Sequence, residues 1–179
     1  MHDSKEICLV TVDGTDFRIN EPSPFSSKWC SQKFNGPALR YELCIAIKSG
    51  YIVAYHGPFP AGKYPDITIF RRKTKTALGT VEKAMADKGY RGDLKGFTPY
   101  DATNKKHKKE MALARSRHET INGRLKAWGA LGQRFRHKLD KHHLIFRSII
   151  VIEQIKIENG RPTFMVSYSD SALMKIEKP

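Results

Sequence analysis

The sequence predicts an α/β fold in which a mixed β-sheet is flanked by α-helices. Three observations support this prediction: a nearly continuous apolar stretch at residues 7–17, two β-rich stretches at 39–47 and 51–56, and a long amphipathic stretch at 106–128. The first is typical of a central strand that is covered on both faces. The others combine an antiparallel hairpin with later alternation of strands and helices, which indicates a mixed sheet.

Turn-forming and helix-capping residues predict the structure of the segments around the hairpin. Residues 20–34 are rich in Ser and Pro and predict a polar loop, and a tight connection at 48–50 joins the two hairpin strands. Residues 57–65 contain three prolines and two glycines, which predicts another loop. Asp66 follows directly, in the N-cap position of a short helix expected at 67–72.

The second half of the chain leads to two helices. The elements expected first are helical turns at 76–83, a short strand at 83–86, a basic loop at 91–109 and the long helix at 106–128. Residues 133–143 predict partly helical structure. Residues 144–157 are apolar and β-branched, so helix and strand both fit their periodicity, and their length favours a helix. A possible strand at 163–168 lies in a C-terminal tail.

Length and composition favour one intracellular domain, at residues 1–160, followed by a tail at 161–179. The longest apolar run, 144–152, is too short to span a bilayer, and no signal peptide pattern follows Met1. We therefore expect no membrane partner, and a nuclear location in a eukaryote or a cytoplasmic one otherwise. The three cysteines form no Cys-x-x-Cys pair, which indicates free thiols in a reducing compartment.

The strongest global property is the formal net charge of +14, which predicts a polyanionic partner such as nucleic acid. Residues 101–143 alone carry twelve Lys or Arg against four Asp or Glu. A basic structural or ribosomal protein would share this charge, but it would not require acidic residues at the ends of secondary-structure elements. Three histidines in this region lack matching cysteines, so phosphate contact or plain exposure is preferred over metal ligation for His137, His142 and His143.

Four acidic residues stand out by position. Asp13 ends the first strand, Asp66 begins the first helix, Asp87 ends the fourth strand, and Glu119 faces outward from the long helix. Carboxylates repel phosphate unless they hold divalent cations, and a pair of such cations can clamp both oxygens of a phosphodiester exchange. Taken singly, each aspartate also fits ordinary turn or cap chemistry, and Glu119 fits a surface ion pair with Arg115.

Four motifs resemble the successive blocks of DDE transposases, and the nearest resemblance is to the PIF/Harbinger-like DDE superfamily endonuclease domain. The motifs are Val12-Asp13-Gly14-Thr15, Gly62-x3-Asp66, Ala86-Asp87-Lys88-Gly89-Tyr90 and Arg115-x3-Glu119-x6-Lys126. The resemblance runs over about residues 10–160. It implies a ribonuclease H-like fold, in which a mixed β-sheet is flanked by helices.

The resemblance also implies the site residues. Catalysis is expected at Asp13, Asp87 and Glu119, with Asp66 as a fourth metal-site carboxylate. Some descriptions of the family count the residue at the Asp66 position as the second aspartate, and topology favours Asp87. The implied cofactor is a divalent cation, Mg²⁺ or Mn²⁺, with two ions per site. The residues expected to contact DNA phosphates are Lys105, Lys106, Lys108, Lys109, Arg115, Arg124 and Lys126.

The function implied is a metal-dependent DNA endonuclease or transposase catalytic domain that cleaves phosphodiester bonds. Full-length members carry an N-terminal helix-turn-helix domain, and this chain is expected to correspond to the catalytic domain without it. A separate DNA-recognition protein and a homo-oligomer are then possible partners. The alternative is a catalytically silent, domesticated or truncated transposase derivative that binds nucleic acid.

Overall fold

The computed structural model describes residues 7–102 and 105–164, which form a six-stranded mixed sheet with helices on both faces. The strands run in the order β2-β3-β1-β5-β6, and β4 also pairs with β3. Their bounds are β1 Ile7–Arg18, β2 Cys30–Ser31, β3 Gly36–Ala46, β4 Ile52–Pro60, β5 Glu82–Met85 and β6 Gly96–Phe97. The helices are η1 Ser27–Trp29, α1 Asp66–Arg72, α2 Thr74–Ala77, η2 Lys88–Tyr90, α3 Lys105–Ala127, α4 Gly129–Gly132 and α5 Leu139–Glu158.

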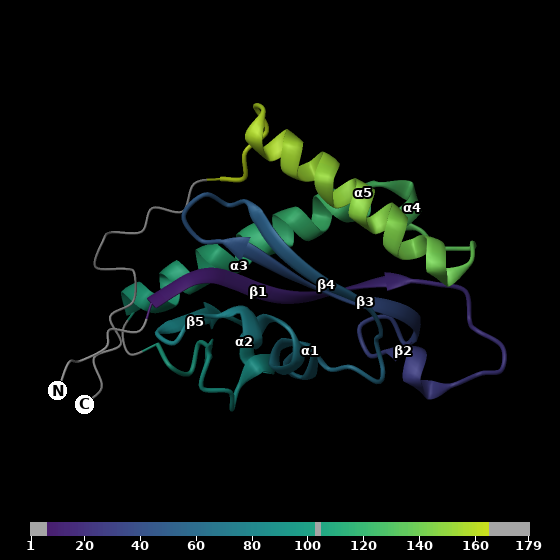
Figure 1. Ribbon diagram of the computed structural model, residues 1–179, viewed down its shortest axis with the longest axis horizontal. Helices are drawn as coiled ribbons and strands as arrows, with labels where there is room; N and C mark the ends of the chain where they lie inside the picture. Colours follow the sequence, from purple (N-terminus) through teal and green to yellow (C-terminus); the bar gives the residue numbers. More distant parts are fainter. Residues whose placement is uncertain (1–6, 103–104, 165–179) are drawn as a thin grey trace.

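The helices divide into two layers around the sheet (Figure 1). α3, α4 and α5 lie on one face, and α1 and α2 lie on the other. This confirms the expected α/β class and is the arrangement of a ribonuclease H-like fold. Within the described ranges, no helix combines the length and the apolar character needed to cross a membrane.

Strand β1 is paired on both sides, as its apolar sequence predicts. It is antiparallel to β3, with Asp13 opposite Leu43, and parallel to β5, with Thr11 opposite Met85. Alternate residues of a strand point to opposite faces, so each face of β1 presents a different set of side chains. Thr11 and Asp13 share one face, while Val12 and Gly14 share the other.

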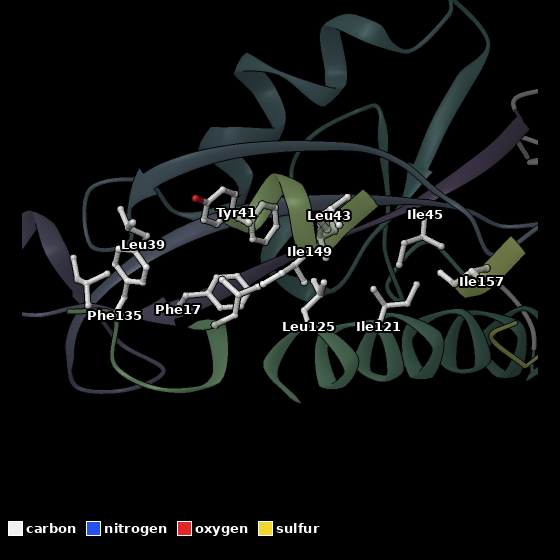
Figure 2. Close-up of a cluster of buried hydrophobic side chains, with 14 residues drawn as sticks. Phe17, Leu39, Tyr41, Leu43, Ile45, Ile121, Leu125, Phe135, Ile149 and Ile157 are labelled. Atoms are coloured by element: carbon white, nitrogen blue, oxygen red, sulfur yellow. The ribbon is translucent and has the colours of Figure 1, made fainter. Parts of the chain in front are cut away.

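The main core lies between the sheet and the layer of α3 and α5 (Figure 2). Tyr41 of β3 stacks on Phe146 of α5, with ring centroids 3.8 Å apart. Ile121 and Leu125 of α3 pack against the same cluster, as the amphipathic pattern predicts. The tyrosine hydroxyl also hydrogen-bonds His142 Nδ1 at 2.8 Å. His142 is fully buried, so the expectation of exposure or phosphate contact was wrong for this residue.

Several expected boundaries differ from the structure. β4 continues through part of the expected loop to Pro60, because β3 supplies pairing partners beyond a register shift. The two-residue strands β2 and β6 were missed, since strands so short carry no periodicity. Asp66 is the first residue of α1 and Pro65 occupies the N-cap, so Asp66 does not cap this helix. Of the possible strand at 163–168, residues 165–168 lie outside the described ranges.

The contrast between two neighbouring residues of α5 tests this packing. Phe146 is fully buried against Tyr41, whereas Leu144 is 62% exposed. We expect Phe146→Ala to lower the free energy of unfolding by about 3–5 kcal/mol, because it removes a buried aromatic ring and leaves a cavity. Leu144→Ala should change it by about 0.5 kcal/mol or less. Urea denaturation of both variants measures the difference, and similar losses would contradict the assigned faces of α5.

Candidate active site

A small pocket opens where β1, β5 and α3 meet. Its volume is about 40 Å³, which exceeds the space required by one water molecule or one small ion. Three of its lining side chains are the carboxylates of Asp13, Asp87 and Glu119. The complete lining consists of Thr11, Val12, Asp13, Met85, Asp87, Arg115, His118 and Glu119.

The topology explains why three residues far apart in the sequence meet here. Thr11 pairs with Met85 in the parallel ladder, and Asp13 and Asp87 each lie two residues further on. Asp87 follows the end of β5, whereas β1 continues to Arg18, so the expectation that Asp13 ends the first strand was wrong. Glu119 comes from α3, which packs on β1, and Glu119 itself is exposed. Asn122, one turn later on α3, donates a hydrogen bond from Nδ2 to Asp13 Oδ2 at 3.2 Å. The helix therefore contributes one carboxylate and also orients another.

The carboxyl group of Asp13 lies in an environment that disfavours its negative charge. Burial raises its pKa to about 6, and Lys33 opposes this while the charges of Asp66 and Asp87 add to it. Repulsion between nearby carboxylates and desolvation act in the same direction. A divalent cation would reverse both effects, because it supplies two positive charges next to the oxygens. The residues present therefore fit a divalent metal ion.

Asp66 lies close to this site but does not line the pocket. Its carboxylate covers Gly14, where any added Cβ would overlap Asp66 Oδ1, so this position of β1 has no room for a side chain. Arg40 Nε lies 3.3 Å from the same oxygen, which is buried and accepts no hydrogen bond. Burial raises the pKa of Asp66, and Arg40 and Lys33 oppose the rise. Gly14 and Asp13 face opposite sides of β1, which separates Asp66 from the pocket.

A buried ion pair fixes the sheet beside Asp66. Arg40 donates to both carboxylate oxygens of Asp16, at 2.7 and 2.9 Å, and Ser31 donates to the same carboxylate at 2.5 Å. These contacts hold the pKa of Asp16 below its ordinary value despite its burial. Arg40 also donates to the carbonyl of Tyr64 at 3.1 Å, which ties the segment before α1 to β3. Bidentate pairs of this kind are strongly directional.

Two polar residues at the site were missed by the sequence analysis. Lys33 donates from Nζ to the carbonyl of Gly14 at 2.7 Å and brings a positive charge next to Asp13. His118 lines the pocket beside Glu119, and burial lowers its pKa to about 4, so its imidazole is neutral at physiological pH. Its ring lies beside the main chain of Thr11, and neither nitrogen makes a hydrogen bond of normal geometry. The sequence did contain one indication of a role for His118, because it is a polar residue on the buried side of α3.

The cations expected to bind DNA fall in four places. Arg115 lines the pocket and forms no ion pair with Glu119 among the described residues. Lys126 lies 5.9 and 5.8 Å from the ring centroids of Phe17 and Phe34. Arg124 donates to two main-chain carbonyls after α5, away from the pocket lining. The exposed residues at the start of α3 are Lys105, Lys106, Lys108 and Lys109.

The raised pKa of Asp13 predicts a pH-dependent change in stability. The folded state holds the Asp13 proton more tightly than the unfolded state, so stability falls as pH rises from about 4 to about 7. Asp13→Asn removes this loss. In EDTA, its free energy of unfolding relative to the wild type should increase by about 1–3 kcal/mol across that range. Urea denaturation at both ends of the range measures it.

The control for this experiment is the exposed Asp140, which lies in the first turn of α5. Asp140→Asn should show no comparable pH-dependent gain relative to the wild type. If the two variants behave alike, the environment assigned to Asp13 is wrong.

Comparison with protein-family models matches residues 12–154 to the family described as DDE superfamily endonuclease. The match spans β1 to α5 and contains all four acidic residues considered above. No curated protein and no solved structure matches the chain. The PIF/Harbinger subtype stays a prediction. With its mixed sheet flanked by helices, and with a family match that covers most of its length, the chain belongs to the DDE superfamily endonucleases.

Proposed function

We propose that this chain is the catalytic domain of a transposase-type DNA endonuclease that depends on divalent metal ions. The observation that supports this most directly is the single pocket shared by Asp13, Asp87 and Glu119. They come from two strands and one helix, and nothing in the packing of a purely structural protein requires carboxylates from three elements to meet. Membership of the endonuclease family supports DNA as the substrate.

The three carboxylates are the residues that would hold the proposed divalent cations, two Mg²⁺ or Mn²⁺ ions. When bound, such ions lower the pKa of a water molecule and stabilise the charge on the leaving 3′ oxygen. Asp66 is proposed to support the site from the opposite face of β1, because its charge acts on Asp13 while its carboxylate covers Gly14. This ranks Asp87 above Asp66 as the second catalytic aspartate.

The neighbouring polar residues have proposed roles in positioning. Asn122 holds Asp13 Oδ2 through its hydrogen bond. Lys33 fixes the carbonyl of the next residue, Gly14, and keeps a positive charge beside the cluster. Together they limit rotation of the Asp13 carboxylate, and precise placement of metal ligands is what such secondary contacts provide.

The basic residues around the pocket are proposed to bind the DNA backbone. Arg115 lies next to the carboxylates, so it can hold the phosphate adjacent to the scissile bond. The exposed lysines at the start of α3 and Lys126 near its end extend the positive charge along the same helix. Contacts of this kind position the strand without reading its sequence. The catalytically silent alternative is less favoured, because all three pocket carboxylates are present.

Cleavage of supercoiled plasmid DNA tests the assignment. The wild-type chain should nick plasmid in Mg²⁺ or Mn²⁺ and should be inactive in EDTA. Asp13→Asn and Glu119→Gln should each lower the nicking rate at least about 100-fold, because each removes a metal ligand. Glu158→Gln, at an exposed carboxylate at the end of α5, should retain wild-type activity. Equal activity in all four proteins would sink the proposal.

The role of Arg115 can be measured separately from cleavage. Arg115→Ala should weaken binding of the catalytically impaired Glu119→Gln chain to duplex DNA by a similar factor for unrelated sequences. The slope of log affinity against log salt should become shallower by about one, because one phosphate contact is lost. Arg147→Ala, at an exposed arginine on α5, should leave the slope unchanged. A sequence-dependent loss would contradict a backbone contact.

A further inference from the structure

A second group of possible metal ligands lies apart from the endonuclease pocket. It consists of Glu42 and Cys44 on β3 and His56 on β4, whose ligand atoms all lie within 4.8 Å of one another. None of the three lines the pocket of Asp13, Asp87 and Glu119. The group therefore requires an explanation of its own.

The strand register brings these residues together. Glu42 pairs directly with His56 across the β3–β4 ladder, so the two side chains leave the sheet on the same face. Cys44 is two residues beyond Glu42 and shares that face. Gly14 and Val12, their partners on β1, face the layer of α1 and α2. The group thus lies on the side of the sheet opposite the main core.

The group is polar and mostly buried, and the two oxygens of Glu42 accept hydrogen bonds from Thr74 and Tyr90. Glu42 is fully buried and Cys44 nearly so. Thr74 donates a short hydrogen bond to Glu42 and lies 3.4 Å from Cys44 Sγ. Burial raises the pKa of Glu42 to about 7 and that of Cys44 to about 12, and the charge of Asp66 adds to the rise for Glu42. Desolvation therefore favours the protonated forms, and a bound cation would favour the ionised carboxylate and thiolate instead.

His56 provides the third ligand and is the least buried member of the group. Its side chain is only partly buried, and none of the hydrogen bonds in the described part of the chain uses its ring nitrogens. Burial lowers its pKa, and the nearby charge of Lys73 acts in the same direction. Both effects favour the neutral imidazole, which is the form that coordinates a metal.

We propose that Glu42, Cys44 and His56 bind a borderline transition-metal ion of the Zn²⁺ type. A carboxylate, a thiolate and an imidazole form a ligand set that suits Zn²⁺ and its analogue Co²⁺, whereas Mg²⁺ prefers oxygen ligands alone. Binding displaces the proton of the Cys44 thiol, and of Glu42 where it is protonated, to solvent. A water molecule would supply the fourth ligand of a four-coordinate ion.

This site does not depend on endonuclease activity, so it can be tested independently. Co²⁺ added to the purified full chain should bind with a thiolate-to-cobalt charge-transfer band in the near ultraviolet, at one equivalent. Zn²⁺ should abolish the band by displacement, and excess Mg²⁺ should not. The band should persist in Asp13→Asn, which impairs only the endonuclease pocket.

Matched variants identify the ligands. Cys44→Ser should remove the charge-transfer band, while Cys30→Ser, at a half-buried thiol outside the group, should retain it. His56→Gln should weaken Co²⁺ binding at least about tenfold, because it removes a ligand at a partly exposed position that folding tolerates. Circular dichroism of each variant verifies the fold. No band in the wild type, a band that survives Cys44→Ser, or one lost in Cys30→Ser alone would overturn the proposal.

Discussion

The parallel pairing of β1 with β5 is the constraint on which the site depends. It sets Thr11 opposite Met85, and through that register it places Asp13, within β1, next to Asp87, just past the end of β5. A slip of one residue would turn Asp13 to the opposite face and place Gly14 in the pocket. The antiparallel pairing of β1 with β3 holds this register from the other side, and the packing of α3 on β1 then brings Glu119 to the same point.

Buried charge is balanced differently on the two faces of β1. On the face of α1, Arg40 neutralises Asp16 through a bidentate pair and also lies against Asp66. On the face of α3, Asp13 has no ion pair among the described residues, and it is supported by the charge of Lys33 and by hydrogen bonds from Asn122 and the main chain of Gly14. In the first arrangement the protein itself neutralises the buried charge of Asp16, and the ion pair stabilises the sheet. The second leaves negative charge that an external cation can neutralise, which is the property required of a metal-binding site.

The sequence predicted the features that depend on local pattern or on family motifs. The strand at 7–17, the hairpin and the helix at 106–128 follow from periodicity, and the helix at 144–157 follows from the length of its apolar stretch. Asp13, Asp87 and Glu119 follow from the motifs. The sequence could not predict contacts made across the sheet. Lys33 lies in an expected loop and reaches Gly14 only because β2 pairs with β3. Likewise, the pairing of Glu42 with His56 depends on the register of β3 and β4, which no local signal specifies.

The free edges of the sheet also limit how this chain can associate with others. β4 lies at one edge, and its second half contains Pro58 and Pro60, which offer no amide hydrogen to an incoming strand. At the other edge, β6 has only two residues. Extension of the sheet by a neighbouring chain is therefore disfavoured on both sides. Any oligomer of this domain, including one assembled on DNA, would have to form through its helices and loops, so its architecture should be sensitive to substitutions on helix surfaces rather than along the strands.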